Sequence, residues 1–266
     1  MHSNCALPFF QIAKQFRALL VCGFLMLLWG MAQAQTQVLG GPAANKATGQ
    51  VVSTGQVQAT LQVYAPKGLV AGETFWLGLQ IQHQPQWHTY WRNPGDSGLA
   101  TELQWQLPEG LTPGNLIWPA PQKIPVGSMA NYGYEGSVLL VTPVQVGPKF
   151  KVSASETDIT VQLRASWLVC KQECIPQEGE FLVRVPVKGS TVMASEAFQA
   201  ALSNQAQSLK GNHSAVIAED GRTLTLKIDA LPPELSAGAW TIYPQTANVM
   251  RNSASPSIQD SQVTLP

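Results

Sequence analysis

The sequence predicts an all-β protein, an antiparallel β-sandwich that is followed by a short helix and the start of a second β domain. Charged residues make up only 12% of the 266 residues, well below the usual quarter, whereas Gly (22) and Pro (19) are plentiful. Apolar and polar residues alternate along several short segments, and turn-forming residues separate these segments. Such a chain favours strands joined by turns over surface helices linked by ion pairs.

The first 34 residues have the layout of a secretory signal peptide and lie outside the predicted fold. A flank with one lysine and one arginine precedes the apolar run 18–29, which is followed by the small-x-small pattern Ala32-Gln33-Ala34. We therefore expect cleavage before Gln35. The run is shorter than the roughly 20 apolar residues that a membrane-spanning helix needs.

Residues 35–52 are small, polar and interrupted by Gly and Pro, and we expect a flexible leader there. The sandwich domain is expected over 53–188. Every second residue is apolar along 56–64 and 74–82, which predicts two half-buried strands. Further strands are expected at 102–107, 137–146, 158–165, 181–187 and 222–229.

One helix is predicted, over 194–209, where Ala, Phe and Leu recur at helical spacing. A new strand pattern follows Gly211. We therefore expect a domain boundary near residue 190, with a linker helix and a second β domain over 189–266. The chain ends at Pro266 just after a strand-like segment, so we expect the second domain to be incomplete and the natural protein to continue.

Export would set the redox context of the cysteines, because compartments beyond the inner membrane allow disulfides to persist. Two of the four cysteines, Cys5 and Cys22, would leave with the signal peptide. Cys170 and Cys174 can then pair only with each other, unless a partner protein supplies a third sulfur.

Removing the two basic residues of the signal leaves 14 basic against 16 acidic residues, a net charge of −2. No basic run indicates nucleic-acid binding.

The residues alone leave a structural and a redox role for this pair about equally supported. A disulfide that closes a loop of about five residues contributes only ~2 kcal/mol in the chain-entropy model, against nearly 5 kcal/mol for about 100 residues. A short local ring can also open and close without unfolding a domain. Lys171 would favour a thiolate at Cys170, although Glu173 opposes one at Cys174.

A metal role is the weakest of the three. Structural zinc commonly takes four ligands, often as two pairs, and the exported chain has one cysteine pair. The remaining histidines, His83, His88 and His213, are isolated from one another in sequence, and Met129 is the only nearby methionine that suits a copper site.

Two further stretches stand out, QWHTYWRNPGDSG at 86–98 and a Pro/Gly-rich segment at 118–136 that contains NYGYEG. In the first, Trp87, Thr89 and Trp91 share a face and are expected in the core, whereas the role of His88 stays open. The second is expected to be a loop before the strand at 137–146. Its Tyr and Gly content also suits a lid over a reactive group.

Four motifs in order, WHTYWRNPGDSG, WPAPQKIPVG, NYGYEG and SWLVCKQECIP, closely resemble the periplasmic N-terminal region of the DsbD/ScsB-type thiol:disulfide interchange proteins. The resemblance runs from about Val57 to Val187. It implies an immunoglobulin-like domain with Cys170 and Cys174 as the catalytic pair, working as a protein-disulfide reductase without a bound cofactor or metal. Cys174 would form the mixed disulfide and Cys170 would resolve it. The residues that fall where the family has its cap loop are Asn131, Tyr132, Gly133 and Tyr134.

The resemblance also implies a location and partners. A thioredoxin-like domain would donate electrons, and periplasmic disulfide proteins such as disulfide isomerases or cytochrome c maturation proteins would accept them. The full-length protein would include an inner-membrane domain that tethers this region in the periplasm. The C-x3-C spacing and the lack of a cap Phe resemble the ScsB-like branch. Two rival functions are a non-enzymatic immunoglobulin-like binding module with a structural disulfide, and a copper-tolerance protein that binds metal.

Overall fold

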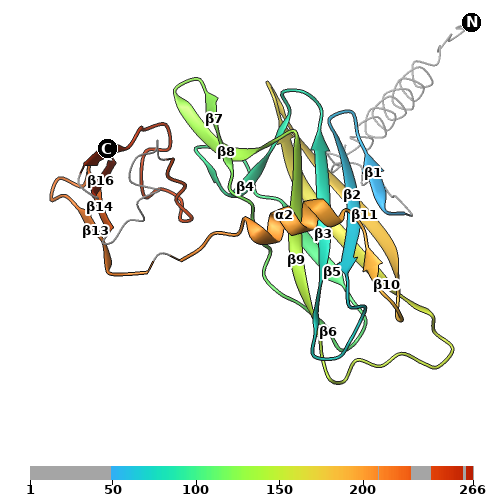
Figure 1. Ribbon diagram of the computed structural model, residues 1–266. Helices are drawn as coiled ribbons and strands as arrows, with labels where there is room; N and C mark the ends of the chain where they lie inside the picture. The colour runs from blue at the N-terminus through green and yellow to red at the C-terminus, as the bar shows by residue number, and fades with distance from the viewer. Residues whose placement is uncertain (1–48, 209, 229–240, 260–261, 266) are drawn as a thin grey trace, which may run out of the picture. The chain divides into compact units, whose positions relative to one another are not determined.

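The computed structural model describes residues 49–208, 210–228, 241–259 and 262–265 (Figure 1). The expected signal peptide and residues 35–48 of the expected leader lie outside the described residues. Strand β1 (Val51–Ser53) begins inside that leader, two residues before the expected domain start. Val52 is buried and pairs with Ala59 of the next strand, so burial extends the fold to these residues.

Two antiparallel sheets form the sandwich, which confirms the predicted all-β class. The first sheet has the order β1-β2-β3-β9-β6, and β12 pairs with the end of β2. Its further strands are β2 (Val57–Ala65), β3 (Thr74–His83), β9 (Ser137–Val146), β6 (Leu111–Pro113) and β12 (Thr191–Val192). The second sheet has the order β11-β10-β4-β8-β7, and β5 pairs with β10. Its strands are β11 (Cys174–Pro186), β10 (Asp158–Cys170), β4 (His88–Gly95), β8 (Met129–Glu135), β7 (Gln122–Val126) and β5 (Glu102–Gln106).

The core lies between the two sheets and consists of the alternating apolar side chains that the sequence pattern identifies. The inward apolar residues of β2 and β3 are almost completely buried. Val161 and Val185 of the facing sheet are completely buried as well. Fully burying such a side chain stabilises the fold by roughly 1.5–3 kcal/mol. The core side chains of β2 and β3 are Val57, Ala59, Leu61, Val63, Phe75, Leu77, Leu79 and Ile81.

Strands β10 and β11 form a long hairpin that extends well beyond the predicted strands 158–165 and 181–187. The pairing runs without a break from Asp158 opposite Pro186 to Cys170 opposite Cys174. Strand β11 contains Pro176, which pairs with Leu168 of β10. Because β11 is an edge strand, a proline is tolerated there, since its missing N–H interrupts no ladder on the open side.

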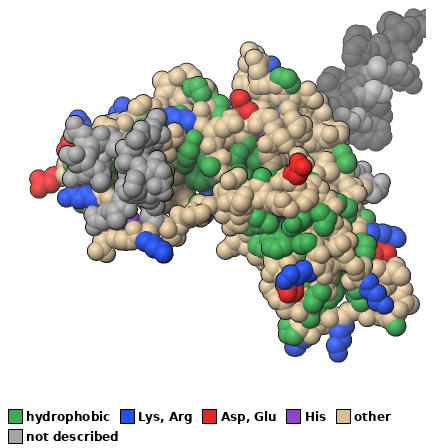
Figure 2. All heavy atoms as spheres, in the orientation of Figure 1, with side chains coloured by type: hydrophobic (Ala, Val, Ile, Leu, Met, Phe, Trp, Pro, Cys, Tyr) green, Lys and Arg blue, Asp and Glu red, His purple; other side chains and the backbone are tan. Residues whose placement is uncertain are grey.

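Helix α2 (Ser195–Ser203) packs on the outer face of the first sheet and ends earlier than the predicted 194–209. Phe198 is its buried anchor and packs against Leu139 and Val141 of β9. Figure 1 shows the helix lying across this sheet, and hydrophobic side chains gather in the same region of the surface (Figure 2). Residues 204–208 are exposed and offer no second apolar anchor, which explains the early end.

The C-terminal strands form a separate antiparallel sheet with the order β13-β14-β16-β15. They are β13 (His213–Ile217), β14 (Leu224–Ile228), β15 (Ser257–Gln259) and β16 (Gln262–Leu265). Strand β14 corresponds to the strand predicted over 222–229. The domain boundary near residue 190 stays a prediction. In the described part of the chain, no helix has the length and apolar character needed to cross a membrane.

Candidate functional site

A disulfide joins Cys170 and Cys174, whose Cα atoms lie 4.2 Å apart. We expected the pair on a loop, but Cys170 is the last residue of β10 and Cys174 the first residue of β11. Successive side chains of a strand point to opposite faces, and Trp167 and Val169 of β10 face the core. Val169 next to it points inward, so Cys170 lies on the outer face of the second sheet, away from the core.

The two sulfur-bearing residues differ in their exposure. Cys170 is only 2% exposed, whereas Cys174 is exposed at the start of the edge strand. Thiol–disulfide exchange proceeds by attack of a thiolate on an accessible sulfur. The geometry therefore makes Cys174 the sulfur that another protein can reach, and keeps Cys170 behind it.

Strand β4 supplies two side chains that lie next to the disulfide. His88 is the cross-strand partner of Cys170, and Tyr90 follows two residues later on the same face. The Tyr90 hydroxyl lies 3.7 Å from the Cys174 sulfur and donates toward it. Burial raises the pKa of Tyr90, and a hydrogen bond with the Asn131 side chain offsets part of this rise, so the hydroxyl remains protonated.

Gly98 lies directly against the ring of Tyr90. Its φ of 106° lies in a region that L side chains rarely adopt, and a Cβ at this position would lie 2.2 Å from the ring. The backbone of the NPGDSG loop thus contacts the tyrosine directly. Tyr90 was not among the residues expected at the site. The alternation in WHTYWR could have identified it, because Thr89 and Trp91 are core residues and Tyr90 must then face outward.

The NPGDSG loop is held in place by its own polar residues. The Asn93 side chain accepts a hydrogen bond from the Gly95 amide at 3.2 Å, which stabilises the turn. Asp96 accepts one from the Ala130 amide of β8 at 2.7 Å. Ser97 donates through both its amide and its hydroxyl to the Asn131 side chain, each at 3.1 Å. Asn131 therefore links the loop to Tyr90.

The four expected cap-loop residues, Asn131 to Tyr134, form the middle of strand β8 and not a loop. The reason is that β8 pairs on both sides, with β7 and with β4, despite the Gly and Pro around it. Alternation divides the four between the faces of the sheet. Asn131 and Gly133 lie on the face of the disulfide, whereas Tyr132 and Tyr134 point into the core.

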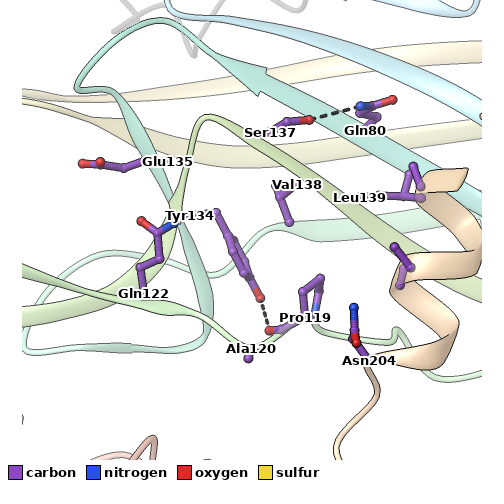
Figure 3. Close-up of a pocket in the computed structure, with 13 residues that line it drawn as sticks. Gln80, Pro119, Ala120, Gln122, Tyr134, Glu135, Ser137, Val138, Leu139 and Asn204 are labelled. Atoms are coloured by element: carbon purple, nitrogen blue, oxygen red, sulfur yellow. Dashed lines mark hydrogen bonds between the residues drawn. The ribbon is translucent and has the colours of Figure 1, made fainter. Parts of the chain in front are cut away.

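The two core tyrosines are anchored through their hydroxyls. Tyr134 donates to the Pro119 carbonyl at 2.8 Å (Figure 3), and Tyr132 donates to the Asn252 carbonyl at 3.5 Å. Burial raises the pKa of Tyr132 to about 12 and that of Tyr134 further. Both remain neutral at physiological pH and support the sheet from its inner side.

The buried histidines His83 and His88 differ in their hydrogen bonding. His83 contacts the Gly136 carbonyl at 2.8 Å through Nδ1 and the Thr89 hydroxyl at 3.0 Å through Nε2, so both ring nitrogens have a partner. His88 is 5% exposed, and its Nε2 has no partner among the described residues. Burial lowers the pKa of both, and for His88 the charge of Glu135 offsets part of the decrease.

A cavity of about 430 Å³ lies between α2, the β8–β9 turn and the Pro119–Ala120 segment (Figure 3). Neither cysteine lines it, and its walls carry small apolar side chains and amides, such as Gln80 and Gln122. The disulfide therefore lies outside this cavity, on the outer face of the second sheet. Among the described residues, no group of three or more His, Cys, Asp or Glu is placed to hold a metal ion.

Comparisons with known proteins agree with the expected family and fold. Residues 54–186 match the family model described as thiol:disulfide interchange protein DsbD, N-terminal. Among solved structures, the chain is similar to the N-terminal periplasmic domain of ScsB from Proteus mirabilis, with 15% sequence identity, 81% of each chain covered and a TM-score of 0.53. At this identity the similarity shows a shared fold. Comparison with curated protein sequences gives no match.

Proposed function

Since the chain belongs to the family of DsbD N-terminal domains, we propose that it is a periplasmic thiol:disulfide interchange domain that reduces partner disulfides through Cys170 and Cys174. The observation that carries the proposal is the asymmetry of the pair. One cysteine is exposed at a strand end and the other is buried behind it, next to a histidine.

The reaction follows from this arrangement. In the reduced domain the Cys174 thiolate attacks one sulfur of a partner disulfide, and the other partner sulfur leaves as a thiolate. Cys170 then attacks the Cys174 sulfur of the mixed disulfide, which releases the second partner thiolate and re-forms the Cys170–Cys174 bond. The partner gains two electrons and the domain loses two, so no cofactor takes part.

We assign the shielding of the pair to Tyr90. Its ring lies against the Gly98 backbone, and its hydroxyl reaches the Cys174 sulfur at 3.7 Å. Asn131 contributes to the cap by bracing Ser97 and Tyr90, and Tyr132 and Tyr134 support the strand from the core. The cap of this domain is thus a side chain of β4 held by a loop, with Asn131, Tyr132, Gly133 and Tyr134 beneath it.

The partners are proposed from the family resemblance. A thioredoxin-like domain would reduce the Cys170–Cys174 disulfide, after electrons pass through an inner-membrane domain of the full-length protein. Periplasmic disulfide proteins would then be reduced, with disulfide isomerases and cytochrome c maturation proteins as the candidate acceptors.

A purely structural disulfide is disfavoured by the hairpin that carries it. Strands β10 and β11 pair along their whole length from Asp158 to Cys170, so the backbone ladder already joins the two strands up to the disulfide. A bond closing such a short loop adds only about 2 kcal/mol. We therefore expect a small loss of thermal stability on reduction and a reduction potential above about −300 mV. A lower potential together with a large stability loss would identify an inert staple and a binding module.

Trapping separates the two cysteines. With Cys170→Ala the mixed disulfide cannot be resolved, so we expect it to accumulate covalent complexes with periplasmic proteins through Cys174. Cys174→Ala is the matched control and should trap far less, because Cys170 is buried. Equal trapping by both variants, or none by either, would contradict the proposal. Titration with Cu(I) or Zn²⁺, followed by thiolate absorbance, tests the copper-tolerance alternative.

A further inference from the structure

The Nε2 atom of His88 is a buried polar atom that lacks a hydrogen-bond partner among the described residues. An unsatisfied buried polar group costs about 1–3 kcal/mol, and native structures retain few of them. The histidine His83 shows that this chain can satisfy both nitrogens of a buried ring. The unpaired atom of His88 therefore requires an explanation.

The position of His88 provides one. His88 lies directly opposite Cys170 across the β4–β10 pair, so the two side chains share a face. Directly opposite residues have Cβ atoms about 4.5–5.5 Å apart. In the disulfide form the Cys170 sulfur carries no proton, so it is at most a weak acceptor and has no hydrogen to donate to an imidazole. Reduction converts this sulfur into an S–H group, so His88 gains a partner only in the reduced domain.

The surroundings keep His88 neutral and able to accept a proton. Burial lowers its pKa below the usual 6.5, and Glu135 of β8, on the opposite flank of His88, offsets only part of this decrease. His83 adds a second buried imidazole nearby, and the two rings disfavour each other's charged form. The other charged residues of the adjoining segments are Arg92 on β4 and Lys171 and Glu173 in the β10–β11 turn.

We propose that His88 accepts the proton of the Cys170 thiol while Cys170 resolves the mixed disulfide on Cys174. The proton moves from the Cys170 sulfur to Nε2, the Cys170 sulfur bonds to the Cys174 sulfur, and the partner sulfur departs with the bonding electron pair. The imidazolium then returns its proton to the departing thiolate or to water. This inference rests on the proposed function and assigns a base to its second step.

The two steps can be timed separately with dithiobis-nitrobenzoate as the partner disulfide. The chain from Gln35 onward, with its two cysteines reduced, should release one nitrothiolate when Cys174 attacks and a second when Cys170 resolves. We expect His88→Gln to slow the second release about tenfold or more near pH 7, since general bases contribute at least this much. The difference should shrink towards pH 9, where the thiol ionises unaided, and the first release should not change.

His83→Gln is the matched control, a buried histidine of the opposite face. It should not slow the second release near pH 7, because both of its ring nitrogens are already bonded to Gly136 and Thr89. An equal slowing at every pH by His88→Gln, or no slowing, would overturn the inference while leaving the proposed function intact. A parent chain that releases no second nitrothiolate would instead contradict the function itself.

If His88→Gln does not fold, alkylation of Cys170 in the Cys174→Ala variant decides the question. The alkylation rate is measured as a function of pH. A second inflection in this curve at the pKa of His88 supports the inference. A single inflection at the ordinary thiol pKa of about 8.5 overturns it.

Discussion

At the scale of single residues, the site depends on which side chain of each strand points outward. His88 and Tyr90 on β4, Asn131 on β8 and Cys170 on β10 share the outer face, and their immediate neighbours fill the core. A shift of β10 by one residue would turn Cys170 into the core, and a shift of β4 or β8 would turn the core aromatics of that strand outward. Core packing thus determines the geometry of the redox face.

Replacing Tyr90 should open the disulfide to small thiols. We expect Tyr90→Ala to be reduced by dithiothreitol several-fold faster than the parent chain, because the ring no longer covers Cys174. The variant should also lose about 3 kcal/mol of stability, since the side chain is fully buried. Alkylation of the freed thiols followed by mass spectrometry measures the rate.

Tyr90→Phe is the control for this experiment, because it retains the ring and removes only the hydroxyl. Its reduction rate should stay close to that of the parent chain. If Tyr90→Ala is reduced no faster than Tyr90→Phe, the ring does not shield the pair.

At the scale of elements, the outer faces of the two sheets carry different features. The outer face of the second sheet carries the disulfide, whereas α2 covers the outer face of the first sheet through Phe198. Gly78 of β3 leaves the space for this ring, because a Cβ there would lie 2.7 Å from Phe198. The disulfide and the helix therefore lie on opposite outer faces of the sandwich, with both sheets between them.

Phe198→Ala should destabilise the protein by about 3–5 kcal/mol, because it removes a completely buried aromatic ring. Gln199→Ala on the exposed side of the same helix should change the stability by less than about 0.5 kcal/mol. Urea unfolding measures both values. The rate of disulfide reduction should stay the same in both variants, and an accelerated reduction in Phe198→Ala would contradict the separation of the two faces.

At the scale of the whole molecule, two buried neutral histidines make the stability depend on pH. Their pKa values are lowered in the folded state, so the unfolded chain binds more protons below its pKa of about 6.5. Stability is therefore complete above this pH and falls on acidification. Each histidine contributes a slope of up to about 1.4 kcal/mol per pH unit.

Urea unfolding between pH 7.5 and pH 5 should show this loss. His83→Gln should unfold with a shallower dependence on pH than the parent chain, because one of the two titrating groups is gone. A stability that stays constant or rises on acidification over this range would contradict the assignment of neutral histidines.

Half of the sandwich strands could be predicted because alternation is a local property that every segment carries by itself. Strand β9 begins and ends where the pattern placed it, β3 and β5 differ by one residue at one end, and β2 differs by one residue at each end. The hairpin β7–β8 was missed because Gly and Pro are usual in loops, and only pairing with β4 extends this segment into a sheet. Helix α2 was predicted too long because one buried Phe stabilises only its first turns.

The sequence by itself determined the strand class, the two cysteines that can pair and the family, since short motifs and periodicity contain all three. Only the tertiary structure decided that the Tyr90 hydroxyl lies next to the Cys174 sulfur, that Asn131 bonds to a distant loop and that His88 lies opposite Cys170. These contacts join residues 34 to 84 positions apart in sequence, and their register is set by packing between the sheets, which no local pattern records.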